Sequence, residues 1–248
     1  MNKLDSVFCE TGGAGFNRFL EDCHSALGIS LVDDGVVLQK LERAWYASVQ
    51  AGTPDFTGYD NPHYLMELWG CWIIYSRKYL MAVRDKMSPV LTNIKSVMDL
   101  GCGFGYSTAA LKEIFPRAKV VGTNFKGGTQ WAMASLYARD RDFSLVGSTD
   151  DVDGYLDLVF ASEYFEHIPD PVDHLEHIIV TRHPRFFVVA NSFGAMAYGH
   201  FPEYQVGGKN IGREHVGRQF SKMMQEYAYE HVKMGLWNNR PALYRRKI

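Results

Sequence analysis

From residue 96 onward, short apolar segments alternate with amphipathic ones, and this alternation constrains the fold more than any other feature of the chain. The apolar segments at residues 96–100, 156–161 and 185–191 are rich in Val, Leu and Phe. Such runs are typical of strands that are buried on both faces of a parallel sheet, and the segments between them have helical spacing. The pattern therefore predicts a doubly wound, mainly parallel α/β sheet.

The part of the chain before residue 91 follows a different pattern. Residues 34–50 and 62–87 carry apolar side chains at helical spacing, and a turn-rich break with Gly and Pro separates them. We therefore expect residues 1–90 to form an N-terminal helical cap and residues 91–248 to form a core built around the sheet.

Two further signals lie after the first strands. Asp170 and Pro171 are the residue types that favour the N-cap and the first position of a helix. Near the C-terminus, the strand-like segments "HVKMGLW" and "ALYRR" flank the turn residues "NNRP". This arrangement predicts an antiparallel hairpin closed by a tight turn.

Composition limits the partners that a chain of this kind binds. The formal net charge is −2, from 26 basic and 28 acidic residues, and the only short basic run is Tyr244 to Lys247. Proteins that grip nucleic acid by its phosphates usually show a basic excess, so this balance disfavours nucleic acid without excluding it. The oligomeric state has no signature in the sequence.

The four cysteines and the apolar stretches bear on compartment and metal binding. No C-x-x-C pair occurs, which argues against a structural zinc or a disulfide framework, so we expect no metal. The N-terminus lacks the apolar run of a signal peptide, and Arg77 and Lys78 interrupt the longest apolar stretch. We therefore expect a cytoplasmic protein without a membrane span.

A glycine-rich loop follows the strand expected at residues 96–100. The segment "VMDLGCGFGYS" places Gly101, Gly103 and Gly105 between that strand and the next helix. Ligands of open α/β sheets bind at the carboxyl ends of strands, and glycines there let the backbone approach the ligand. The first turn of the following helix suits an anionic group, and Asp99 offers a carboxylate to a cationic one.

Asp99, the "LGCGFG" loop and the C-terminal hairpin together resemble class I S-adenosylmethionine-dependent methyltransferases, in the branch that acts on small molecules, sugars and quinones. The resemblance covers about residues 95–191 and the hairpin. It implies a seven-stranded sheet and S-adenosylmethionine as cofactor, held by Asp99 and the three loop glycines. It also implies methyl transfer to an oxygen or nitrogen atom of a small-molecule, sugar or nucleotide-like acceptor.

Four more residues take cofactor roles through this resemblance. Asn124 stands where most members carry the acid that accepts hydrogen bonds from the ribose, and Gln130 matches a Gln of relatives with a neutral residue there. Asp150 lies near the position of an acid that holds the adenine amino group. Arg77 matches an Arg that contacts the cofactor carboxylate in quinone methyltransferases. Each has an alternative interpretation: a turn residue for Asn124, a helix surface residue for Gln130, a solvated acidic loop for Asp150 and a surface arginine for Arg77.

The passage "ASEYFEHIPDP" resembles the "E-x-x-E-H-x-x-D-P" segment of small-molecule, sugar and quinone O-methyltransferases. A hydroxyl or amine acceptor must lose a proton, so His167 is the first candidate for the general base and Glu163 for an acceptor contact. Glu166 is expected to brace the loop. Residues 192–228, glycine-rich at first, are expected to form an acceptor lid that carries His200 as the second base candidate. A histidine satisfied by a backbone carbonyl is the alternative for His167, and an idle loop histidine is the alternative for His200.

Other functions fit the residues less well. A short-chain nicotinamide dehydrogenase needs a Tyr-x-x-x-Lys pair beside its active site, and the only match, Tyr229 with Lys233, lies near the C-terminus. Amino-methylating nucleic-acid enzymes carry Pro-Pro where this chain has "SEYF", and carbon-5 cytosine enzymes need a Pro-Cys dipeptide that is missing. A nucleic-acid base methyltransferase and a non-catalytic cofactor-binding subunit stay open as alternatives.

Overall fold

The protein was analysed as a computed structural model that describes residues 6–8, 17, 19–21, 23–25, 28, 35–236 and 240–247. Its main sheet contains β1 (Ser96–Leu100), β2 (Lys119–Thr123), β3 (Ser144–Val146), β4 (Leu158–Ser162), β5 (Phe186–Ala190), β8 (Tyr229–Val232) and β9 (Ala242–Arg246). The strand order is β3-β2-β1-β4-β5-β9-β8, with β1 to β5 parallel and β9 antiparallel to both neighbours. The predicted sheet and its C-terminal antiparallel hairpin are confirmed.

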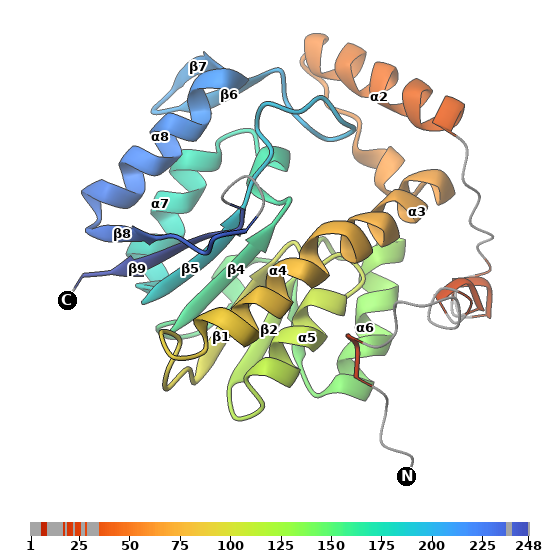
Figure 1. Cartoon of the computed structure of the whole chain (residues 1–248). Coiled ribbons are helices and arrows are strands. Elements are labelled where there is room, and N and C mark those ends of the chain that lie inside the picture. Colours follow the sequence, from red (N-terminus) through yellow and green to blue (C-terminus); the bar gives the residue numbers. More distant parts are fainter. Residues whose placement is uncertain are drawn as a thin grey trace.

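Helices cover both faces of this sheet (Figure 1). One face packs against α4 (Arg77–Ala82), α5 (Tyr106–Ile114) and α6 (Thr129–Arg141), and the other against α7 (Pro171–Arg182) and α8 (Arg213–Glu226). Successive residues of β4 alternate between the two cores, so Phe160 joins the α5 side while Val159 and Ala161 join the α7 side. This alternation explains why the strands are apolar throughout.

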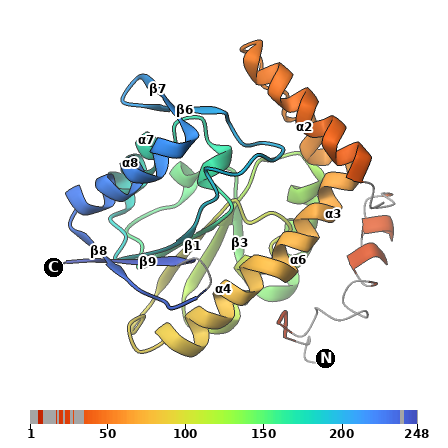
Figure 2. The same ribbon diagram turned by 45° about the horizontal axis from the view of Figure 1, so that its top comes forward.

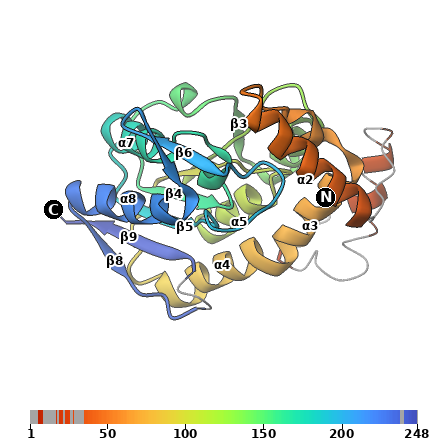
Figure 3. The same cartoon turned by 90° about the horizontal axis from the view of Figure 1, so that it is seen from above.

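The N-terminal helices form where helical spacing predicted them. They comprise α2 (Gly35–Gln50), a 3-10 helix over Phe56–Asp60, and α3 (Pro62–Cys71), which continues into α4 through the π-helical segment Trp72–Ser76. Figures 2 and 3 show α2 and α3 beside the segment that leaves β5. The division of the chain at residue 90 stays a prediction.

Two local predictions differ from the structure. The tight turn at "NNRP" is wrong, because the pairing of Val232 with Leu243 leaves residues 233–241 to connect β8 and β9. Residues 237–239 of this connection lie outside the described part of the chain. Pro171 begins α7 as predicted, whereas the Asp170 side chain makes no capping hydrogen bond. The ψ of 58° at Asp170 departs from the extended conformation of a capping residue.

The segment predicted as a lid, residues 192–228, contains several elements. After a loop come β6 (Glu203–Val206) and β7 (Lys209–Gly212), which form a separate two-stranded sheet, and then α8, which packs against α7 and β8. Among the helices that the structure describes, none is long and apolar enough to cross a membrane.

Candidate active site

A cavity of about 510 Å³ opens at the carboxyl ends of β1, β2 and β4, which is where ligands of open α/β sheets bind. The glycine loop after β1 forms its floor, and the N-terminal helices contribute an aromatic wall that includes Tyr59, Tyr64 and Trp72. The segment that follows β5 closes another side. Eight of the residues singled out in the sequence line this cavity: Asp99, Gly101, Gly103, Asn124, Gln130, Glu163, His167 and His200.

The glycine loop presents bare backbone to the cavity. Gly101 and Gly103 have φ of 63° and 55°, in the left-handed region that favours glycine. A Cβ at Gly101 would lie 2.5 Å from the Tyr164 ring, whereas a Cβ at Gly103 would have Gln130 Oε1 at 3.9 Å as its nearest neighbour. Gly105 precedes α5 with φ 88° and packs against other side chains rather than lining the cavity.

Asp99 lies beneath this loop and is almost fully buried, with 1% of its surface exposed. Its Oδ2 accepts hydrogen bonds from the hydroxyls of Ser107 and Thr108, both at 2.6 Å, on the first turn of α5. Burial raises the pKa of this carboxyl to about 7, and the two hydroxyls oppose that shift. A cationic group in the cavity would therefore stabilise the ionised form of Asp99.

Asn124 braces the same loop, and Gln130 lies beside it. The Asn124 amide donates to the carbonyl of Gly103 at 2.9 Å, and the Gln130 amide donates to the carbonyl of Tyr59 at 3.4 Å. Since the amide nitrogen of Gln130 points to Tyr59, the Gln130 Oε1 faces Gly103 and can accept a hydrogen bond.

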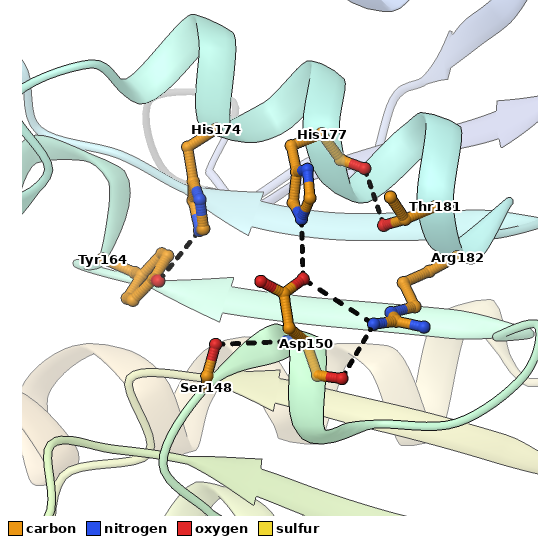
Figure 4. A network of polar contacts seen from close by, with 7 residues as sticks. All are labelled: Ser148, Asp150, Tyr164, His174, His177, Thr181 and Arg182. Atoms are coloured by element: carbon orange, nitrogen blue, oxygen red, sulfur yellow. Dashed lines mark hydrogen bonds and ion pairs between the residues drawn. The ribbon is translucent and has the colours of Figure 1, made fainter.

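Asp150 lies outside the cavity lining. Figure 4 shows its carboxylate turned to α7, where it accepts a hydrogen bond from His177 Nε2 at 2.7 Å and approaches Arg182. The hydrogen bond from His177 lowers the pKa of Asp150. Asp150 thus connects the segment after β3 to α7, and it lies apart from the cavity-lining residues that the resemblance assigns to the cofactor.

Arg77 also lies outside the cavity lining. Its guanidinium donates to the backbone carbonyl of Phe8 through Nε at 3.1 Å and Nη2 at 2.9 Å. The position of Arg77 on α4 turns the side chain toward residues 6–8, so it is separated from the other residues expected to hold the cofactor.

Two carboxyl groups meet at the exit of β4. Glu163 lines the cavity with a φ of 52°, which is uncommon for a residue with a side chain and marks strain of the kind found at functional sites. Glu166 is fully buried and accepts a hydrogen bond from the backbone N–H of Ser192. Burial and the neighbouring Glu163 raise the pKa of Glu166 well above its usual value. Glu166 therefore braces the exit of β4 through Ser192, and the raised pKa favours its neutral form.

His167 faces the N-terminal part of the chain. Its Nδ1 lies 2.8 Å from the hydroxyl of Tyr59. Burial raises the pKa of Tyr59, so the phenol keeps its proton, and the partner recorded for that proton among the described residues is His167 Nδ1. With Tyr59 as the donor of this hydrogen bond, the neutral His167 ring carries its own hydrogen on Nε2. Burial and the nearby His200 also lower the pKa of His167 to about 3, which makes it a weak base.

His200 has the opposite arrangement of nitrogens. Its Nδ1 lies 3.1 Å from the carbonyl of Ala195, which can only accept, so this nitrogen donates and Nε2 keeps its lone pair in the neutral ring. Burial lowers the pKa of His200 below its usual value. The two rings meet edge to face, with 4.7 Å between their centroids. His200 is thus a cavity-lining histidine whose lone pair lies on Nε2.

Sequence reasoning missed several residues of the cavity wall. Tyr59 lies in the break that was read only as turn-rich, and Arg240 lies in the predicted turn "NNRP". Arg240 Nη1 donates to the hydroxyl of Ser192 at 2.6 Å. The high aromatic content of the sequence, with 14 Tyr, 15 Phe and 5 Trp, is a general signal of an aromatic wall, and nothing in the local sequence marks Arg240.

The core of the chain matches a known family. The family described as "Methyltransferase domain" (Methyltransf_11) matches residues 98–180, a range that includes the glycine loop and the exit of β4. Trans-aconitate 2-methyltransferases from strains of Escherichia coli are 32% identical to this chain over 100 residues. That stretch is 38% of this chain and 38% of theirs, so the match spans well under half the length of these curated relatives.

Solved structures resemble the chain over more of its length. An O-methyltransferase family protein from Burkholderia thailandensis has a TM-score of 0.53 at 11% identity and covers 84% of this chain and 70% of its own. The plantazolicin methyltransferase BpumL, solved with SAH, has a TM-score of 0.55 at 9% identity, with 84% and 97% covered. The S-adenosylmethionine-dependent methyltransferase SibL has a TM-score of 0.52 at 12% identity, with 94% and 76% covered.

At these identities the structural likeness shows the fold, while the family match shows what the central segment is. Residues 98–180 thus match a methyltransferase domain, and the chain as a whole has the α/β fold of solved methyltransferases.

Proposed function

We propose that the protein transfers the methyl group of S-adenosylmethionine to an oxygen or nitrogen atom of a small-molecule acceptor. One observation carries this proposal: a single cavity joins the glycine loop after β1 to the carboxylate of Glu163 and the ring of His200. Methyl transfer is a displacement between two bound molecules, so a shared enclosed space supplies the positioning on which its rate depends.

Residues of the loop are suited to the cofactor. The open space at Gly103 admits close approach of a ligand to the backbone, and the start of α5 favours the cofactor carboxylate. Asp99 is the partner for the cofactor ammonium. The Gln130 Oε1 accepts from the ribose, and Asn124 acts by holding the loop through Gly103.

The lone pairs of the two histidine rings decide which residue we assign as the general base for the acceptor. We assign the general base to His200, because its Nε2 keeps a lone pair, and give His167 a positioning role, because its Nδ1 is engaged by Tyr59. Glu163 is the second polar contact for the acceptor. Residues 192–200, which line the cavity and contact α2 through Trp45, form the part of the predicted lid that covers the acceptor.

Two observations support a small acceptor. The cavity volume of about 510 Å³ falls in the range of small-molecule sites, and its wall is mainly apolar and includes many aromatic side chains. The curated relatives that share the central segment are named for trans-aconitate, a small molecule.

The test combines binding with transfer. Calorimetry with S-adenosylhomocysteine measures cofactor binding, and incubation with methyl-labelled S-adenosylmethionine shows which host fraction receives label. We expect binding and label in the small-metabolite fraction. Failure to bind the cofactor product would refute the methyltransferase proposal, whereas label confined to nucleic acid would refute only the small acceptor.

A further inference from the structure

One cation in the cavity wall has no carboxylate partner. Lys126 and Arg240 are the two Lys or Arg residues in the described lining, and Lys126 lies at the mouth, where its Nζ is 3.8 Å from Asp151. Arg240 is half-buried, and no ion pair of its guanidinium is recorded among the residues that the structure describes. A guanidinium without a counter-ion in a largely aromatic wall favours an anion.

Arg240 and its partner Ser192 have hydrogen-bond donors that can bind this anion. Its Nη1 donates to Ser192 Oγ at 2.6 Å, so the Ser192 oxygen acts as an acceptor and its hydroxyl proton stays available to donate. The backbone N–H of Ser192 is already used by Glu166. The remaining N–H groups of the guanidinium and the Ser192 O–H thus form adjacent donors, which is the pattern that binds the two oxygens of a carboxylate.

The neighbouring acids do not neutralise Arg240. Burial and the neighbouring Glu163 raise the pKa of Glu166, which favours its neutral form. Glu163 lines the same cavity, yet no contact within ion-pair distance joins it to Arg240. Arg240 lies on the connection between β8 and β9, a segment separate from the glycine loop.

We propose that Arg240 and Ser192 form a subsite that binds a carboxylate group of a ligand in this cavity. The proposal rests on the proposed function and adds the chemical class that the site recognises. The carboxylate belongs either to the methionine part of the cofactor or to the acceptor, and the two sources give different results below. If the cofactor supplies the carboxylate, Arg240 takes the role that the sequence had suggested for Arg77.

The experiment compares wild type with Arg240→Gln and, as a matched control, Arg218→Gln on the exposed face of α8. Calorimetry measures the affinity for S-adenosylhomocysteine and for 5′-methylthioadenosine, which lacks the amino-acid part. Benzoate and its neutral analogue benzamide are titrated separately, with and without S-adenosylhomocysteine. Ser192→Ala serves as a second variant, and thermal unfolding checks that each protein is folded.

If the cofactor supplies the carboxylate, Arg240→Gln lowers the affinity for S-adenosylhomocysteine by about tenfold or more and leaves that for 5′-methylthioadenosine unchanged. If the acceptor supplies it, the affinity for S-adenosylhomocysteine is kept, and a preference of wild type for benzoate over benzamide disappears in the variant. Ser192→Ala shifts the same affinity in the same direction by a smaller factor. Arg218→Gln changes neither.

The subsite is overturned if Arg240→Gln and Ser192→Ala bind both S-adenosylhomocysteine and benzoate as tightly as wild type does. It is also overturned if wild type shows no preference for benzoate over benzamide and both variants bind S-adenosylhomocysteine as wild type does. Failure of wild type to bind S-adenosylhomocysteine or 5′-methylthioadenosine would instead count against the proposed function. The benzoate titration alone would then decide on Arg240.

Discussion

The hydroxyl of Tyr59 lies 2.8 Å from Nδ1 of His167, and this hydrogen bond joins the N-terminal part of the chain to the exit of β4. Glycines make the approach possible. A Cβ at Gly199 would collide with the Tyr59 hydroxyl and the His167 ring, and one at Gly58 would lie 2.5 Å from the Tyr198 ring. The 3-10 helix Phe56–Asp60 and the segment after β5 therefore interlock over the cavity.

The Tyr59 contact should stabilise the fold. Replacement of Tyr59 by Phe leaves the buried Nδ1 of His167 without its donor, so we expect the free energy of unfolding to fall by about 1–2 kcal/mol. Urea denaturation measures the loss. The control is Tyr155→Phe, whose side chain is 75% exposed and should have no effect. Equal stability of both variants would mean that the hydrogen bond contributes nothing.

The two histidines should differ in their effect on turnover. Removal of a general base lowers the rate by about 10² to 10⁴-fold, so we expect this loss for His200→Ala with nearly unchanged affinity for S-adenosylhomocysteine. His167→Gln should lose less. Single-turnover rates with labelled cofactor make the comparison. A larger loss for His167→Gln would return the base to His167.

The same assignment fixes a pH dependence. The neutral form of His200 is the base, and burial lowers its pKa below its usual value. At saturating cofactor, activity should therefore be flat from about pH 7 to 8 and fall only when the pH drops through the lowered pKa. A rise in rate centred above pH 6.5 would contradict this.

A side chain at Gly103 should block the cofactor without unfolding the protein. Gly103 faces the cavity, and the nearest neighbour of a new Cβ is 3.9 Å away, so Gly103→Arg fills ligand space. The φ of 55° adds a strain of about 1 kcal/mol. Gly154→Arg is the control, since Gly154 has φ 78° with nothing within 4 Å and lies outside the lining. Calorimetry should show no binding of S-adenosylhomocysteine for Gly103→Arg and normal binding for Gly154→Arg.

Cofactor affinity should depend on the ionisation of Asp99. Burial raises its pKa from 3.8 to about 7, so in the empty protein the carboxyl is largely protonated below that pH. Pairing with the cofactor ammonium requires the carboxylate, so affinity should rise with pH up to about 7 and then level off. Calorimetry from pH 5.5 to 8.5 measures the trend. Asp99→Asn should abolish it, and a pH-independent wild type would remove Asp99 from the ligand contacts.

Without ligand, Asp99 affects stability with the opposite sign. A folded-state pKa above the unfolded value means that its contribution is present below about pH 4 and is lost as the pH rises to about 7. Asp99→Asn should therefore be more stable than wild type at pH 8, provided that the amide keeps the hydrogen bonds from Ser107 and Thr108. Urea denaturation at pH 5 and pH 8 should show the difference growing with pH.

The sequence by itself determined the sheet, the helices on both faces and the glycine loop. These features follow from neighbouring residues: strand burial sets the run of apolar side chains, and Gly101 and Gly103 set the backbone at the end of β1. The end of β8 and the long connection after it escaped prediction, because strand register depends on which residues pair across the sheet.

Only the tertiary structure decided which polar groups face the cavity. Arg77 was expected inside and is held by the carbonyl of Phe8, while Arg240, far along the chain, lines the wall. Tyr59 engages Nδ1 of His167, and the carbonyl of Ala195 engages Nδ1 of His200. A side chain's partner and protonation depend on groups that packing brings together, and sequence distance carries no record of that packing.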